Sequence, residues 1–429
     1  MTGSVNATSV QIQSSSTADL EDIRRARTEI LRITDPEDAP TSALIQLVGP
    51  VLAADYLTGR AQLTSRVLAE HLEERGVQDL AGAQALSTTV SERNQRWVTR
   101  RGHITAEQDA QLARACDAWF CIPEDDDWPN SLNDLDTAGP VGIWGRGDRA
   151  RLAQLNRALT VAVVGSRDVT SYGNSATSHL AGDLAAAGYT VISGGAFGVD
   201  ATAHRAALAT GVGDLSTVAL MAGGLDRLYP KHNEQLLHSI IEQGLVLSEI
   251  PLGQNPTRFR FLQRNRLIAA LSDSTVVVEA RWRSGALNTA NHALALGRSV
   301  YAVPGPIFSP TSEGCHRLIR DGLAQLTTDA RHIIEDSAPL GNQNEQSLLS
   351  QPDTHQLLID SLTEAQARVW DLLPVRTPVG ADTLVAQVGL PGRTVMLTLS
   401  QLASLGLATT NRGGWAKTRM PADNPAVGR

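Results

Sequence analysis

The feature that most constrains the fold is an alternation of short apolar runs with longer helix-like segments between residues 158 and about 335. The runs consist almost entirely of apolar, β-branched or small residues, which is typical of strands buried on both faces of a sheet. Helical crossovers between such strands make them parallel. The pattern therefore predicts a doubly wound, mostly parallel α/β sheet. The runs are 160–164, 189–192, 217–221, 245–248, 275–278 and 299–303.

Loops rich in glycine and polar residues follow these runs. The carboxyl ends of parallel strands meet at one edge of a sheet, and doubly wound proteins bind their ligands there. The loop at 193–198 precedes a helix, so its backbone amides are predicted to hold a phosphate. It is neither a Walker loop nor a dinucleotide fingerprint, and we expect no nucleotide cofactor. The residues expected at this edge are Gly165, Ser166, Arg167, Ser193, Gly194, Gly195, Lys231, Ser284 and Gly285.

The stretch from 258 to 266 is unusually basic and aromatic. It holds four arginines and two phenylalanines in nine residues, with no acidic residue. Guanidinium groups pair with phosphate, and a phenyl ring offers any base a stacking face. The stretch predicts a groove for single-stranded nucleic acid, although an ordinary basic surface would have a similar composition. We expect it to form a loop leading into a helix at 267–268. Its candidate binding residues are Arg258, Phe261, Arg264, Asn265 and Arg266.

Composition limits where such a site can lie. The formal net charge of the chain is −8, so a nucleic-acid site has to be a local positive pocket in an acidic body. The three cysteines, Cys116, Cys121 and Cys315, have no metal-site spacing, and we expect buried thiols in a reducing, cytoplasmic environment. No apolar run approaches 18 residues, so no membrane span is expected.

Signs of catalysis are weak. The histidines of the α/β region are scattered, without the spacing of a metal pair or of a nucleophile and its base. Glu249 and Glu279 each follow a strand, so a carboxylate pair at the ligand edge is conceivable. We nevertheless predict that the protein is not an enzyme, with no catalytic residue and no metal.

The rest of the chain divides by composition. Residues 1–20 are rich in Ser and Thr and predict a disordered tail, and 21–117 predict a small helical (SAM-like) domain. The α/β core is placed at 118–336, with a polar linker at 337–360. Residues 361–429 predict three helices and a two-stranded wing, as in a winged helix. Its third helix has few basic side chains, which favours a protein contact or weak DNA contact over sequence-specific readout.

An ordered series of motifs resembles the DNA-processing DprA/Smf family. The resemblance is dense over about 160–325 and looser over the lead-in from Trp128-Pro129 to Gly147. It implies an extended Rossmann-like core that binds single-stranded DNA, loads the RecA recombinase in natural transformation, and forms a homodimer. The motifs are Gly165-Ser166-Arg167, Ser193 to Asp200, Tyr229-Pro230, Leu247-Ser248-Glu249, Arg264 to Ala269, Val278-Glu279-Ala280, Ser284-Gly285 and Val303-Pro304-Gly305.

The resemblance also implies individual roles. Arg167, Arg258, Arg264 and Arg266 would neutralise phosphates, and Phe261 would stack on a base. The amides of 193–195 would hold one phosphate. Two alternatives stay open: a phosphoribohydrolase acting on a nucleotide with Glu279 as its carboxylate, and a duplex-DNA regulator working through the winged helix.

Overall fold

The computed structural model describes residues 17–74, 80–101, 106–337, 362–375, 377–411 and 413–418. The chain divides into two compact units, residues 1–337 and 338–429. Helix α1 begins at Thr17, inside the stretch predicted as a tail. The remainder of that tail and the predicted linker from 338 onward lie outside the described residues. Within the described ranges, no helix has the length and apolarity needed to cross a bilayer.

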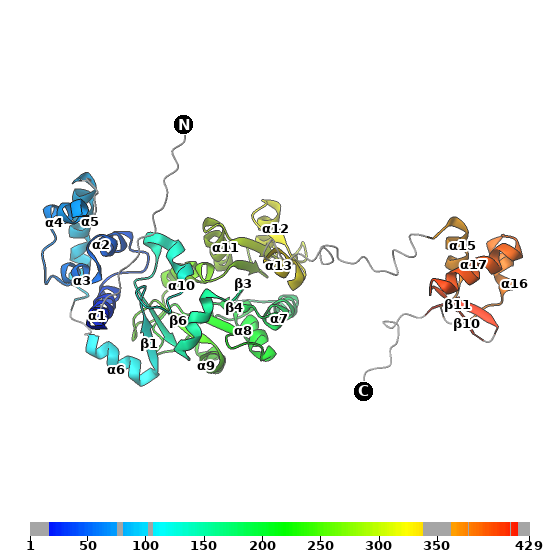
Figure 1. The fold of residues 1–429 in the computed structure, drawn as a ribbon, viewed down its shortest axis with the longest axis horizontal. Coiled ribbons are helices and arrows are strands. Elements are labelled where there is room, and N and C mark those ends of the chain that lie inside the picture. Colours follow the sequence, from blue (N-terminus) through cyan, green and yellow to red (C-terminus); the bar gives the residue numbers. More distant parts are fainter. Residues whose placement is uncertain are drawn as a thin grey trace. The chain divides into compact units, whose positions relative to one another are not determined.

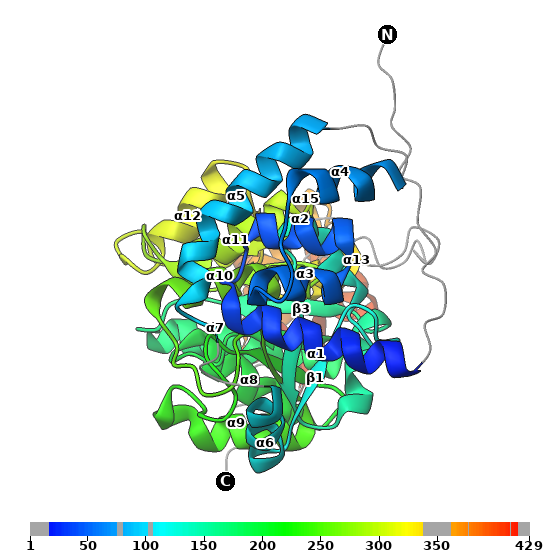
Figure 2. The same cartoon turned by 90° about the vertical axis from the view of Figure 1, so that its left-hand side faces the viewer.

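The N-terminal part of the first unit is helical, as predicted. Helices α1 to α5 enclose a small apolar core, and α6 packs beside the first strand (Figure 2). The apolar spacing over residues 42–56 predicts one helix, but the structure divides it, because Gly49 has a φ of 81° and Pro50 opens the next helix. The helices are α1 (Thr17–Ile33), α2 (Ala39–Val48), α3 (Pro50–Thr58), α4 (Ser65–Glu74), α5 (Leu80–Val98) and α6 (Ala106–Cys116).

A single large sheet forms the centre of the first unit (Figure 1). Its order is β1-β2-β6-β5-β4-β3-β7-β8-β9; β1 and β2 are antiparallel and the pairs from β6 to β9 are parallel. The strands are β1 (Ala118–Cys121), β2 (Ile143–Arg146), β3 (Thr160–Val164), β4 (Thr190–Ser193), β5 (Thr217–Leu220), β6 (Leu245–Ser248), β7 (Ser274–Val277), β8 (Ser299–Ala302) and β9 (Gln325–Leu326).

Helices cover both faces of this sheet, which confirms the predicted doubly wound α/β architecture. One face packs against α7 (Ser171–Ala186), α8 (Val199–Thr210), α9 (Glu234–Gln243) and α13 (Ala330–Ser337). The other face packs against α10 (Arg258–Ala270), α11 (Gly285–Ala295) and the 3-10 segments η1 (Asn130–Ala138) and η2 (Arg149–Asn156). Segment η3 (Lys231–Asn233) precedes α9, and α12 (Glu313–Arg320) precedes β9.

The strand order reverses direction between β3 and β7. From β3 the chain adds β4, β5 and β6 on one side, and α10 then crosses to β7 on the other side. At such a switch point the loops leaving the two strands diverge and open a crevice at their carboxyl ends. The loops at this crevice are 165–170, after β3, and 278–284, after β7.

The second unit consists of α15 (Glu364–Leu372), α16 (Ala381–Val388), α17 (Gly392–Ser404) and the hairpin β10 (Ala408–Asn411) and β11 (Gly414–Lys417). Helix α15 starts with a capping box, in which Thr363 and Gln366 exchange hydrogen bonds of 2.9 and 3.4 Å. The sequence predicts helices at 363–373, 381–388 and 393–405 and strands at 407–410 and 415–418, and every element lies within one residue of its predicted span. The assignment of this unit as a winged helix stays a prediction.

Candidate nucleic-acid interface

A cavity of about 630 Å³ lies at the switch point of the sheet. Its walls come from the loops after β3 and β7 and from the first turns of α10. The rings of Tyr229 and Phe261 also line it. Asp168 and Asp200 are outnumbered by arginines in the lining, so the cavity is net positive although the chain is net negative. These cavity arginines are Arg167, Arg258, Arg264, Arg281 and Arg283.

Helix α10 carries the arginine-rich stretch and begins earlier than predicted. Thr257 is its N-cap, and the Thr257 hydroxyl accepts a hydrogen bond of 3.3 Å from the Arg260 backbone N–H. Residues 258–266 are therefore helical, and the predicted loop is wrong. The helical period turns Arg258, Phe261 and Arg264 toward the cavity, with Asn265 beside them.

Arg264 is the most unusual of the cavity arginines. It is 5% exposed, yet its guanidinium forms no hydrogen bond or ion pair with any residue that the structure describes, and its Nε is buried without a partner. Burial lowers the pKa of Arg264 to about 10, so the side chain stays charged at neutral pH. A buried charge without hydrogen-bond partners is costly, and an anion entering the cavity would supply them.

Gly194 makes room for this guanidinium. A Cβ at position 194 would overlap Nη1 and Cζ of Arg264. We therefore expect Gly194→Ala to displace Arg264 and to lower nucleic-acid affinity about as much as loss of Arg264 itself, while the helices stay folded by circular dichroism. Gly182→Ala is the matched control, because a Cβ there meets nothing within 4 Å. Unchanged affinity in Gly194→Ala would show that the position of Arg264 does not matter for binding.

The predicted phosphate cradle at 193–198 is partly occupied by the protein's own groups. The Ser193 hydroxyl is buried and donates to the Val163 carbonyl oxygen at 2.7 Å, and the Gly195 carbonyl accepts from Asn233. The Ala196 N–H donates to the Asp200 carboxylate at 3.4 Å. Ser193 and Gly195 line neither the main cavity nor a small neighbouring one, which Gly194 does line. An anion entering the main cavity would thus meet Arg264 before it met the backbone amides of residues 193–195.

Two further predicted residues lie elsewhere. Arg266 is 1% exposed, and its guanidinium forms a bidentate ion pair with Glu249, with N–O distances of 3.0 and 2.7 Å. Its Nε also lies 3.2 Å from Glu37. Arg266 thus joins helix α10 to β6 and to the α1–α2 loop, and it has no free guanidinium to offer a phosphate. Lys231 is exposed in η3 and does not line the cavity.

The opposite wall holds residues that the sequence predicted and two that it missed. Ser284 is the N-cap of α11, and Gly285 accepts a hydrogen bond of 3.2 Å from the Asn265 side chain, which fixes α10 against α11. Arg281 and Arg283 also line the cavity but were not predicted. Their position directly before the Ser284-Gly285 motif was the available signal.

The Phe261 ring lies close to three other side chains that line the cavity. The Arg167 guanidinium carbon lies 4.7 Å from the ring centroid, and that of Arg264 lies 6.0 Å away. The Tyr229 ring is 6.0 Å from it, centroid to centroid. Arg167 is exposed and can leave the ring, whereas Arg264 is held in place by burial. Gly165 and Ser166 complete this side of the lining.

The carboxylates considered for catalysis are engaged elsewhere. Glu279 accepts hydrogen bonds from the Thr170 N–H and hydroxyl, at 3.0 and 2.6 Å, and from the Thr311 hydroxyl at 3.1 Å. It does not line the cavity, and Glu249 is paired with Arg266. The phosphoribohydrolase alternative assigned its carboxylate to Glu279, and this geometry gives that assignment no support.

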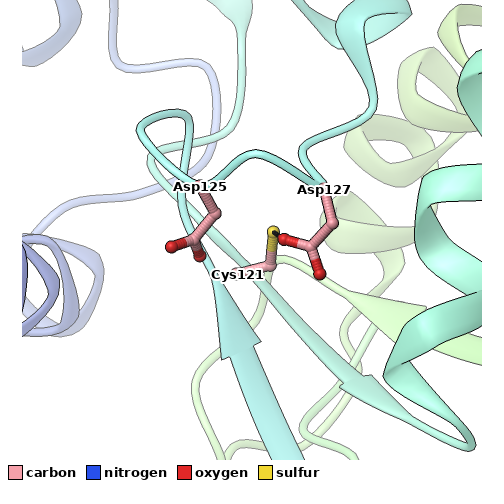
Figure 3. A group of neighbouring side chains, drawn as sticks. All are labelled: Cys121, Asp125 and Asp127. Carbon is pink, nitrogen blue, oxygen red and sulfur yellow. Dashed lines mark hydrogen bonds between the residues drawn. The ribbon is translucent and has the colours of Figure 1, made fainter. Parts of the chain in front are cut away.

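A cluster of Cys121, Asp125 and Asp127 has ligand atoms close enough to suggest a metal ion (Figure 3). The carboxylates already pair with arginine: Arg149 contacts Asp125 at 3.0 Å and Asp127 at 2.7 Å, and Arg24 also contacts Asp125. Burial and the two carboxylates raise the pKa of the Cys121 thiol far above its ordinary value, which disfavours the thiolate that a metal requires. We interpret the cluster as a structural link between α1 and the β1–η1 loop.

A doubly wound sheet with an arginine-lined cavity at its switch point defines a Rossmann-like protein with a candidate anion-binding site. Residues 119–338 match the model of the family described as DNA recombination-mediator protein A. The chain is 37% identical over 414 residues to a putative DNA processing protein DprA of Mycobacterium tuberculosis, covering 94% of this chain and 96% of that relative. It is 36% identical over 306 residues to protein Smf of Escherichia coli, covering 70% and 77%.

A solved structure agrees with these relatives. The X-ray structure of DNA processing protein A from Streptococcus pneumoniae superposes with a TM-score of 0.53 and 28% identity, over 76% of this chain and 99% of that one. The chain therefore belongs to the DprA/Smf family of DNA-processing proteins.

Proposed function

We propose that this DNA-processing protein binds single-stranded DNA in the cavity at the switch point, with the phosphates held by arginines and one base stacked on Phe261. The observation that carries the proposal is Arg264, a buried charged guanidinium without a hydrogen-bond partner among the described residues. Its position at an opening lined by further arginines suits a polyanion better than a single small anion.

The aromatic residues favour a single strand over a duplex. In a duplex the base faces are stacked on one another, so a ring in a cavity has no access to them. In a single strand, each base offers a face to Phe261. A base arriving on the ring displaces Arg167, whose guanidinium then becomes available to a phosphate. Such contacts read the backbone and base stacking, so binding is only weakly specific for sequence.

The family description suggests a partner for the proposed site. The family description as a recombination mediator supports transfer of the bound strand to the RecA recombinase. We propose that the chain does this without catalysis. We extend the proposal to a cytoplasmic homodimer formed through the core, acting on DNA taken up in natural transformation. The test of this part is RecA filament assembly on single strands coated with single-strand-binding protein, which the chain is expected to accelerate.

The binding proposal is tested by fluorescence anisotropy with a labelled oligothymidine and with a duplex of the same length. We expect the single strand to bind more tightly, and its affinity to fall with salt with a logarithmic slope of about −0.7 per phosphate neutralised. Equal or preferred binding of the duplex would contradict the cavity assignment and favour the second unit as the DNA-binding part. A flat salt dependence would contradict the phosphate contacts.

A further inference from the structure

The loop after β7 carries an exposed tryptophan between two of the cavity arginines. Trp282 is 50% exposed, and Arg281 and Arg283 on either side of it are exposed as well. The guanidinium of Arg317, on α12, lies over the Trp282 ring at 4.6 Å from its centroid. Arg281 and Arg283 line the cavity, whereas Trp282 and Arg317 lie outside its lining. We call these four residues, Arg281, Trp282, Arg283 and Arg317, the Trp282 platform. The platform adjoins the cavity through Arg281 and Arg283.

The charges of the Trp282 platform are not compensated. None of its arginines forms a side-chain hydrogen bond or an ion pair with a residue in the described part of the chain. Glu313, one turn before Arg317 on α12, forms no ion pair with it there either. Other arginines of the same unit behave differently: Arg266 and Arg149, for example, each pair with carboxylates. Uncompensated arginines around a half-exposed indole are suited to an anionic ligand with aromatic parts.

The platform is held in place by backbone contacts. The Ala280 N–H donates to the Thr311 carbonyl at 2.7 Å, and the Gly314 N–H donates to the Ala280 carbonyl at 2.8 Å. A Cβ at Gly314 would meet the Ala280 carbonyl oxygen at 2.7 Å, so glycine allows α12 to approach the loop closely. Helices α11 and α12 lie side by side at this end of the sheet (Figures 1 and 2). Arg317 is therefore positioned over Trp282 before any ligand arrives.

We propose that the Trp282 platform is a second base-stacking site, which continues the path of a single DNA strand beyond the cavity. This inference rests on the proposed function, because it needs a strand already bound beside Phe261. A strand leaving the cavity passes Arg283 and Arg281, and its next exposed base stacks on the indole. The two aromatic positions, Phe261 and Trp282, would then contact different nucleotides of one strand.

The test compares two oligothymidines, of about four and about sixteen nucleotides, the range of site sizes known for single-strand-binding folds. We expect Trp282→Ala to weaken binding of the long probe by about fivefold or more, as for loss of a stacked base, and to leave the short probe unaffected. Trp282→Leu should lose as much as the alanine variant, because it keeps apolar bulk but no aromatic face. Trp282→Phe should retain most of the affinity.

Each other outcome has a defined meaning. Wild-type affinity of Trp282→Ala for the long probe would overturn the platform and leave the cavity proposal intact. An equal loss with both probes would also overturn it, because Trp282 would then be acting on the cavity itself. Failure of the wild-type protein to bind either probe would refute the proposed function and this inference with it. Trp282 is half exposed, so these substitutions are not expected to unfold the protein.

Discussion

Replacing Arg264 with alanine is expected to reduce affinity for single-stranded DNA by roughly 10- to 150-fold, the range for loss of hydrogen bonds to a charged group. The physical reason is that Arg264 is charged, buried and without a hydrogen-bond partner among the described residues, so an anion in the cavity would supply that partner. The measurement is anisotropy with oligothymidine at fixed salt. Arg157→Ala is the matched control, since Arg157 is exposed just before the amino end of β3, away from the cavity.

Asp200 provides a second test of the same site. Its carboxylate neighbours Arg264 and lines the cavity, so it competes with phosphate for the guanidinium. Burial raises the pKa of Asp200 above its ordinary value of 3.8, with Arg264 opposing the shift. As the pH falls through that raised pKa, Asp200 becomes neutral, the cavity gains net positive charge, and DNA binding should tighten. Asp200→Asn should bind more tightly at neutral pH and lose this dependence.

The two variants together separate function from folding. Arg264→Ala with normal affinity, in a protein that still unfolds cooperatively, would show that the cavity is not the DNA site. An Asp200→Asn variant that binds more weakly would show that the carboxylate positions Arg264 and does not compete with its ligand. Arg264→Lys should recover only part of the affinity, because an ammonium keeps the charge without the planar fork of donors.

The order of strands and helices in the core could be predicted from the sequence because burial on both sides makes each strand apolar throughout. Strand β6 was predicted with the bounds that the structure gives it, and the segment from about 199 to 210 predicts helix α8 at its observed bounds. Helix α5 was missed, since residues 80–98 are rich in serine, threonine and small residues and lack a clear apolar stripe. The start of α10 was misplaced because a run of arginines and phenylalanines has no helical apolar period, whereas the cap at Thr257 is a single side-chain contact.

Which arginine faces the cavity could not be predicted from composition. Arg264 and Arg266 are two residues apart on the same helix, and both were assigned to phosphate. A separation of two residues turns side chains by about 200° around a helix, so the two must point in different directions. Which of them meets the carboxylate of Glu249 depends on how α10 crosses the sheet, and that is a property of the tertiary fold. Arg281 and Arg283 were missed although their loop was expected at this edge, because a loop has no sequence period that shows which of its side chains face a cavity.

Arg266→Met is expected to destabilise the first unit by about 3–5 kcal/mol, the cost of removing one partner of a buried ion pair. The substitution leaves the Glu249 carboxylate buried, at 3% exposure, without its guanidinium. It also removes the contact with Glu37, so the α1–α2 loop should become more sensitive to protease. The measurement is urea denaturation, with the midpoint compared between variant and wild type. DNA affinity of the folded protein should change little, in contrast to Arg264→Ala.

The double variant Arg266→Met with Glu249→Leu tests whether the unpaired Glu249 carboxylate causes the loss of stability. Replacing both members of a buried pair with apolar residues of similar volume is often neutral, so this protein should recover most of the lost stability. If the double variant were as unstable as Arg266→Met, the lost stability would come from poorer packing around position 266 and not from the unpaired Glu249 carboxylate. If Arg266→Met lost DNA affinity while keeping its stability, Arg266 would belong to the DNA site after all. The neighbouring arginines of α10 thus have separable tasks, one in holding the fold together and one in binding its ligand.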